Sequence, residues 1–217
     1  MRLLVMAKAP VPGLAKTRLA VAVGERQAAD IAAAALLDTI AACTDAVGTS
    51  SCVLALAGDL DDGVAADEIR AALEGWTVFA QRGDNFNERL VLAHQDAGDG
   101  PLLQIGMDTP QVTSALLAAA GSALTDNDTV LGAADDGGWW VLGRHTAVAA
   151  EALRGVPMST YTTHDDTRAA LLARGLTVAA TTTLTDVDTA VDAELVAAAA
   201  PDTRFAQSWT ALRGVPS

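Results

Sequence analysis

Residues 103–110 read LQIGMDTP, and this stretch decides how we interpret the rest of the chain. The apolar run 102–105 predicts a buried strand that ends at Gly106. Asp108 follows at once, and Pro110 stands where we expect a helix to begin. Open α/β sheets bind ligands beyond the carboxyl ends of their strands, so this carboxylate marks a candidate binding site.

A second stretch repeats the pattern. Residues 129–133 predict another buried strand, which runs into Asp135 and Asp136. If the two strands are neighbours, Asp108 and Asp136 face each other across one cleft. Mg²⁺ and Mn²⁺ prefer oxygen ligands and commonly bind through one or two carboxylates plus substrate phosphates. We therefore predict a Mg²⁺ or Mn²⁺ site on Asp108 and Asp136, with Asp135 as the alternative to Asp136. The competing interpretation is that each aspartate only caps a turn or a helix.

Composition restricts the class of protein. The 217 residues are 51% apolar, which suits one sizeable core, and they contain no apolar run of the ~18 residues that suggests a membrane span. The formal net charge of −13 argues against a nucleic-acid partner, although a divalent cation reverses the field within a cleft. Cys43 and Cys52 are expected to be buried free thiols. The N-terminus lacks a signal-peptide pattern, so we expect a cytoplasmic protein.

Strand-like and helix-like stretches alternate along the chain, which favours a Rossmann-like α/β fold with a mainly parallel sheet flanked by helices. We expect a single domain over residues 1–217, because no linker or repeat interrupts the pattern. The expected strands are 2–6, 51–57, 77–80, 102–105, 129–133, 138–143 and 176–181. The expected helices are 25–43, 65–73, 86–97, one from Pro110, one through Leu153, one reaching Arg174, and 193–200.

The loop after the first strand is rich in cations for so acidic a chain. Lys8, Lys16 and Arg18 lie close together in the sequence, around Pro12 and Gly13. Loops between a strand and the next helix often bind phosphate, and glycine permits close approach of the backbone. We predict that these five residues contact the phosphates of a nucleotide. A surface turn with solvated cations is the alternative.

Gly83, Glu88 and Arg89 fall in a polar segment that precedes a predicted helix. Such a segment has the hydrogen-bonding groups to contact a base or a ribose. Local capping of the helix would produce a similar string of residues. Both interpretations stay open.

The Gly137–Gly138 pair follows the second acidic turn and lets backbone pass close to a ligand. If Trp139 and Trp140 alternate on a strand, one faces the core and the other, for which we choose Trp139, lines an acceptor pocket. Purely structural roles explain these residues equally well. Asp186 and Asp188 offer a third acidic contribution to the site, or simply favourable charge at a helix start.

With these residues in view, the chain resembles a known family. Residues 8–19, KAPVPGLAKTRL, look like the K-A-P-x-x-G-x-x-K-T-R-L opening of the DUF2064 glycosyltransferase-like proteins. Residues 105–110 are similar to the I-G-x-D-x-P segment of that family, and residues 131–143 to its G-P-x-x-D-G-G-Y-Y-L-I-G segment. Residues 184–189 look like its closing D-V-D-T element. The family resembles the phospholactate guanylyltransferases and belongs to the GT-A, or nucleotide-diphospho-sugar transferase, superfamily.

The resemblance implies a GT-A fold in which the first loop holds a nucleotide and the acidic turns hold a divalent ion. It points to Lys16 and Arg18 for phosphates, and to Asp108 and Asp136 for the metal.

The chain departs from the family pattern in three places. Residues 85–87 are Asn-Phe-Asn where Asp-Leu-Gly is usual, Met158 stands where tryptophan is common, and residues 139–140 are tryptophans in place of tyrosines. The first departure concerns base or ribose contacts. The tryptophan pair implies an acceptor pocket with more aromatic surface and fewer hydroxyl groups.

Three functions follow. We favour a metal-dependent transferase that uses a nucleotide-activated donor, preferably a nucleotide-sugar, and a small-molecule acceptor, with Asp135 as the nearest candidate for a general base. A nucleotidyltransferase would instead use an NTP and a phosphorylated acceptor and release pyrophosphate. A nucleotide-binding protein without catalytic activity is the third hypothesis.

Overall fold

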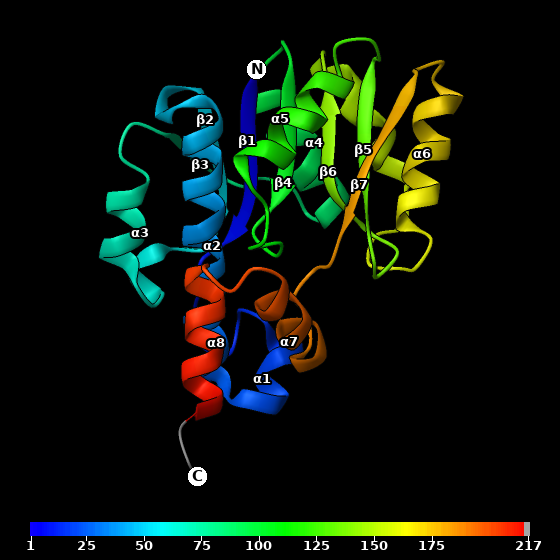
Figure 1. Cartoon of the computed structure of the whole chain (residues 1–217). Helices are drawn as coiled ribbons and strands as arrows, with labels where there is room; N and C mark the ends of the chain where they lie inside the picture. Colours follow the sequence, from blue (N-terminus) through cyan, green and yellow to red (C-terminus); the bar gives the residue numbers. More distant parts are fainter. Residues whose placement is uncertain (215–217) are drawn as a thin grey trace.

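The computed structural model describes residues 1–214 (Figure 1). Its strands are β1 (Arg2–Lys8), β2 (Cys52–Ala57), β3 (Thr77–Ala80), β4 (Leu102–Gly106), β5 (Thr129–Ala134), β6 (Trp139–Arg144) and β7 (Val178–Leu184). The α-helices are α1 (Thr17–Val23), α2 (Glu25–Val47), α3 (Ala66–Ala72), α4 (Phe86–Asp96), α5 (Ser114–Ala123), α6 (Thr163–Ala173), α7 (Ala190–Ala199) and α8 (Arg204–Gly214). Short 3-10 helices are η1 (Thr49–Ser51), η2 (Leu60–Asp62) and η3 (Ala147–Gly155).

The strands form one 7-stranded sheet in the order β3-β2-β1-β4-β6-β5-β7. Neighbouring strands are parallel except at β6, which runs antiparallel to both β4 and β5. The predicted α/β fold with a mainly parallel sheet is therefore confirmed. The carboxyl ends of β1, β2 and β4 meet at one edge, where such sheets bind ligands.

The strands before Asp108 and Asp136 are not neighbours, so the condition set for their facing each other directly is not met. The turn after β5 is tight, with Gly137 N donating to Ala134 O at 3.1 Å and Ala134 N to Gly138 O at 2.9 Å. The turn reverses the chain, so β6 pairs back along β5 and lies between it and β4. The two acidic turns are thus separated by one strand.

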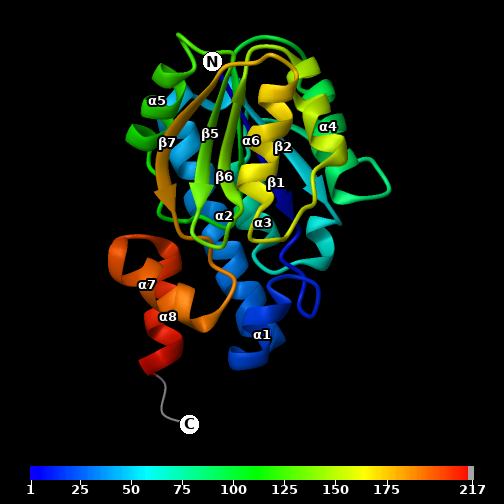
Figure 2. The same ribbon diagram turned by 90° about the vertical axis from the view of Figure 1, so that its right-hand side faces the viewer.

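Alternate residues of the central strands face opposite helical layers, as the pleat of a strand requires. On β1, Leu3 packs in a cluster with residues of α2, α3 and α5, whereas Leu4 packs with residues of α4, η3 and α6. Figure 2 shows α5 on one flank of the sheet and α4 and α6 on the other. No helix within residues 1–214 has the length and apolar character needed to cross a membrane.

A third apolar cluster lies beyond the edge of the sheet, where α1, α7 and α8 gather beside α2 (Figure 1). Leu19, Ile31, Val187 and Phe205 are buried in it. Asp38, on α2, accepts hydrogen bonds from the backbone N–H of Arg204 at 3.1 Å and of Phe205 at 2.8 Å. These bonds satisfy donors at the start of α8, which no sequence pattern had predicted.

Local signals placed some helix boundaries wrongly. The helix expected from Pro110 begins at Ser114, because the Thr113 side chain accepts a hydrogen bond from Leu116 N and caps it there. The helix expected through Leu153 is the 3-10 helix η3. The capping box between Thr189 and Asp192 is present, but it opens α7 at Ala190 rather than at residue 193.

Candidate functional site

A cavity of about 500 Å³ opens at the carboxyl edge of the central strands. It extends from the end of β1 and the first loop to the segments that follow β4, β5 and β7. One end is charged, with Lys8, Lys16, Arg18, Asp108, Asp136, Asp186 and Asp188 among its lining residues. The remainder is lined mainly by α4, β6 and the loop before α6.

Lys16 is the most constrained cation of this end. It stands at the N-cap of α1 with a φ of 49°, in the left-handed region, and its side chain is only 6% exposed. Its ammonium group pairs with Asp108, donates to Val187 O, and lies 3.6 Å from Asp188 Oδ1. Burial lowers the pKa of Lys16, but the attraction of Asp108, Asp188 and Asp186 outweighs it and holds that pKa above its ordinary value.

The other predicted phosphate ligands divide into two groups. Lys8 lines the cavity and donates from Nζ to Leu14 O at 2.8 Å, while Arg18 pairs with Asp188 at 3.0 Å and keeps an exposed side chain. Pro12 and Gly13 are not among the lining residues. Gly13, with a φ of 78°, shapes the loop instead.

Three carboxylates lie near one another beside Lys16. Asp136 Oδ1 accepts a hydrogen bond from Gly138 N at 2.7 Å, and the Asp108 side chain remains 44% exposed. Burial together with the negative charges of Asp108 and Asp136 raises the pKa of Asp186 to about 7. The sequence had suggested Asp186 as a contributor, and the structure places it at the cavity.

This donor set suits a divalent cation that also binds a phosphate. Within residues 1–214 the structure has no group of three or more His, Cys, Asp or Glu side chains arranged as a ready-made metal site. Mg²⁺ does not require such a cage, since one or two carboxylates plus substrate phosphates suffice. Burial is the largest cause of the raised pKa of Asp186, and the charges of Asp108 and Asp136 raise that pKa further; a cation held by these two carboxylates would offset the second contribution. The residues present therefore fit such an ion.

The predicted role of Asp135 receives no geometric support. Its Oδ2 accepts a hydrogen bond from Thr185 Oγ1 at 2.6 Å, and it is not one of the residues that line the cavity. Gly138 does line the cavity, whereas Gly137 lies against the backbone of Tyr161. Gly137 therefore acts through the shape of the turn.

The polar segment before α4 contributes mainly by capping. Glu88 accepts from Asp84 N at 2.9 Å, and its own N–H donates to Asn85 Oδ1 at 3.0 Å. Neither Glu88 nor Gly83 lines the cavity, but Arg89 does, and its Nε donates to Gly83 O at 3.3 Å. Of the three predicted base or ribose contacts, only Arg89 is placed to touch a ligand.

Two glutamines also line the cavity. Gln81 begins the polar segment for which base or ribose contacts were considered, whereas the sequence assigned no role to Gln104. Gln81 donates from Nε2 to Ala7 O and Ala55 O, both at 2.9 Å, and so ties the ends of β1 and β2 together beside the cavity. Gln104 lines the cavity from within β4. A polar residue inside an otherwise apolar strand was the available signal for Gln104.

Residues 36–160 match the family model described as "Uncharacterized protein conserved in bacteria (DUF2064)", which spans more than half of the chain. The chain belongs to the DUF2064 family. No curated protein matches it in sequence.

Solved structures show where this DUF2064 fold recurs. A Desulfovibrio desulfuricans G20 protein named a "putative nucleotide-diphospho-sugar transferase" is 24% identical, with a TM-score of 0.82 over 98% of this chain and 95% of that one. A cytidylyltransferase from Leptospira borgpetersenii is 13% identical, with a TM-score of 0.59 over 98% and 91%. Rv0371c of Mycobacterium tuberculosis H37Rv, in complex with manganese, is 18% identical, with a TM-score of 0.50 over 90% and 98%. At these identities the likeness shows a shared fold.

Four of the six positions at which this DUF2064 chain departs from the family pattern line the cavity, whereas Asn85 and Asn87 do not. Trp140 is 2% exposed, belongs to the core cluster under α2 and α5, and donates from Nε1 to Thr182 O at 2.7 Å. Trp139 packs against the opposite cluster, so the two side chains alternate as predicted, and both contribute to the cavity. Phe86 and Met158 line the cavity as well. These four side chains give the cavity an aromatic and apolar part of its lining.

Proposed function

We propose that this protein is a metal-dependent transferase that takes a nucleotide-activated donor, with a nucleotide-sugar as the favoured donor. The observation that carries the proposal is the convergence of Asp108, Asp136 and Asp186 with Lys16 at one end of a single cavity. The cavity volume of about 500 Å³ lies in the range of small-molecule sites. The names of the Desulfovibrio and Mycobacterium neighbours, one a transferase of this kind and one a manganese complex, support the same assignment.

The chain's own residues have distinct roles in this proposal. Asp108 and Asp136 would hold Mg²⁺ or Mn²⁺, which when bound supplies positive charge to the diphosphate leaving group. Lys16 and Arg18 bind phosphate oxygens from the first loop. Trp139 lies in the aromatic and apolar part of the lining and positions the acceptor against the donor. We assign no general base, because Asp135 lies outside the cavity lining.

Nucleotidyl transfer is the second candidate. Lys8, Lys16 and Arg18 at the charged end suit a triphosphate as well as a diphosphate, and the Leptospira neighbour is a cytidylyltransferase. In this case an NTP and a phosphorylated acceptor would yield pyrophosphate.

A thermal-shift screen tests the proposal. NDPs, NTPs and nucleotide-sugars are added with and without Mn²⁺, because a ligand that binds the folded state raises its apparent stability. We expect a Mn²⁺-dependent rise in Tm with at least one nucleotide-sugar, followed by release of the NDP when acceptors are supplied. Pyrophosphate release from an NTP would support the second candidate. Tight binding without turnover would indicate a binding protein, and no stabilisation by any nucleotide would contradict the proposal.

A further inference from the structure

Gln104 is a polar residue at the centre of an apolar region. It is 2% exposed and lines the cavity, and its register partners are Leu4 on β1 and Leu142 on β6. A buried amide in such surroundings requires hydrogen-bond partners for both its oxygen and its nitrogen. The group behind Gln104 therefore decides which of the two is left for the cavity.

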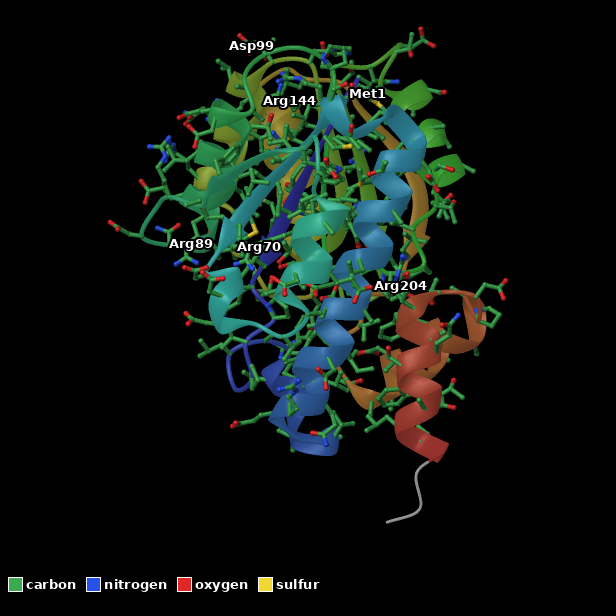
Figure 3. All side chains as sticks on the ribbon, turned by 90° about the vertical axis from the view of Figure 1, so that its left-hand side faces the viewer. Met1, Arg70, Arg89, Asp99, Arg144 and Arg204 are labelled. Atoms are coloured by element: carbon green, nitrogen blue, oxygen red, sulfur yellow. The ribbon has the colours of Figure 1, made fainter. Side chains whose placement is uncertain are left out.

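Behind Gln104 lies a fully buried arginine. Arg144 donates from Nε to His94 Nδ1 at 3.1 Å, from Nη2 to His94 O at 2.9 Å and Gly98 O at 2.8 Å, and from Nη1 to Gly100 O at 3.0 Å. Figure 3 shows Arg144 near Asp99, toward the end of the molecule where Met1 lies, with Arg89 well away from it. The hydrogen bonds of Arg144 thus lie toward the end of the molecule where Met1 lies.

Arg144 determines the tautomer of His94. A guanidinium group has only donors, so His94 Nδ1 must accept. Burial, and then the charge of Arg144, lowers the pKa of His94 to about 3, so the ring is neutral at pH 7. A neutral ring whose Nδ1 accepts carries its hydrogen on Nε2.

His94 Nε2–H and Gln104 Oε1 are complementary. Both atoms are buried, and neither has a hydrogen-bond partner among residues 1–214. Gln104 lies opposite Leu142 of β6, on the same face of the sheet as Arg144, which holds the His94 ring through Nδ1. A buried donor and a buried acceptor left over on one face satisfy each other, so we assign the Nε2–H donor to Gln104 Oε1. The Gln104 NH₂ group donates to no other residue among 1–214.

We propose that Gln104 is a specificity-determining residue whose NH₂ group is fixed toward the cavity as a donor to an uncharged oxygen or nitrogen acceptor of the substrate. A carbonyl of a base and a hydroxyl of a sugar share this chemistry. The inference rests on the proposed function, because it names a contact that the nucleotide-activated donor makes. His94 and Arg144 act through Gln104 and are positioning residues. If the hydrogen were on Nδ1 of His94 instead, Gln104 would turn its oxygen to the cavity and select a donor.

The first experiment needs no ligand. Long-range ¹H–¹⁵N NMR of the histidine rings in the full chain reports which nitrogen of His94 carries the hydrogen. We expect the neutral Nε2–H tautomer, unchanged between about pH 5 and 8. The Nδ1–H tautomer would overturn the proposal, since it reverses the polarity of the Gln104 group at the cavity.

The second experiment measures ligand selectivity. Calorimetry in the presence of Mn²⁺ measures the affinity for UDP, GDP, ADP and CDP and for their glucose conjugates. The proteins compared are the wild type, Gln104→Met and the control Gln95→Met. Gln95 is a suitable control because its side chain is exposed. We expect Gln104→Met to weaken the best-bound probe about tenfold and Gln95→Met to leave its affinity unchanged. If Gln104→Met loses affinity for both the NDP and its glucose conjugate, the acceptor lies on the nucleoside. If it loses affinity for the conjugate alone, the acceptor lies on the sugar.

The outcomes distinguish failure of the Gln104 contact from failure of the proposed function. Equal affinity of the wild type and a folded Gln104→Met variant for every probe would overturn the role of Gln104 while leaving the proposed function intact. Failure of the wild type to bind any probe would contradict the proposed function, and the inference about Gln104 would fall with it. A lower Tm of Gln104→Met without altered selectivity would also overturn the inference, because it indicates a purely structural amide.

Discussion

Lys16 and Asp108 form an ion pair that joins the first loop to the end of β4, at the charged end of the cavity. The same ammonium group lies 3.6 Å from Asp188 Oδ1, so one buried cation serves two carboxylates. If Asp108 holds the proposed divalent cation, that cation competes with Lys16 for the carboxylate, and phosphate oxygens that bind the ammonium group would relieve the competition. This competition makes the roles of metal and lysine separable by experiment.

Replacing Lys16 by methionine is expected to tighten binding of Mn²⁺ alone by about tenfold, because the competing charge is removed. The same variant should bind nucleotide more weakly, since a phosphate ligand is lost. Electron paramagnetic resonance of free Mn²⁺ measures the first effect. Lys8→Met is the control, because Lys8 donates to Leu14 O rather than to a carboxylate. Unchanged Mn²⁺ affinity in a folded Lys16→Met variant would contradict the competition.

Asp186 should make the protein less stable as the pH rises. Its pKa is about 7 in the folded protein and ~4 in the unfolded chain, so below about pH 4 it is protonated in both states and costs nothing. Above about pH 7 it is ionised in both states and folding carries the full cost of ~2–4 kcal/mol. Asp186→Asn should therefore gain stability over the wild type between pH 4 and 8, in urea unfolding without metal.

The exposed Asp202 provides the control, and Asp202→Asn should show no such gain. A constant difference between Asp186→Asn and the wild type across this pH range would show that Asp186 ionises normally.

His94, unlike Asp186, should make the protein more stable as the pH rises. Its pKa is about 3 in the folded protein against ~6.5 in the unfolded chain, so its contribution is fully present above about pH 6.5 and is lost as the pH falls toward 3. Relative to His94→Gln, the wild type should lose about 2 kcal/mol of unfolding free energy between pH 7 and 5. Denaturant unfolding at several pH values measures this, and parallel pH profiles of the two proteins would refute it.

Gly137 should tolerate substitution worse than Gly175. Both have positive φ, 89° and 76°, but an added Cβ at Gly137 would lie 2.3 Å from Tyr161 Cα, whereas none of the described atoms lies within 4 Å at Gly175. Gly175→Ala should cost about 1 kcal/mol of backbone strain. Gly137→Ala should cost about 3 kcal/mol or displace the loop that carries Thr160 at the cavity wall. Equal Tm values for the two variants would contradict this packing.

Much of the fold was predictable because the relevant signals are local. The continuous apolar run that includes Leu3 and Leu4 predicts a buried strand, and the pairing of Thr189 with Asp192 follows helix-capping chemistry. The insertion of β6 between β4 and β5 was not predictable in this way, because strand order depends on which distant edges meet.

The candidate site also contains some residues that local sequence signals predict and others that they do not. Asp108, Asp136 and Lys16 stand at the ends of recognisable segments, and the structure brings them to one cavity. The burial of Asp186 and the grouping of Arg144, His94 and Gln104 on one face of the sheet depend on contacts between distant residues. Such contacts leave only weak traces in the sequence, such as a polar residue within an apolar strand.

The most direct test of the central claim is calorimetric titration of the best-bound nucleotide-sugar, with and without Mn²⁺, into the wild type, Asp108→Asn and the control Asp202→Asn. We predict that Mn²⁺ tightens binding to the wild type and to Asp202→Asn by at least about tenfold, and that Asp108→Asn loses this gain. The same Mn²⁺-dependent affinity in Asp108→Asn as in the wild type would contradict the account.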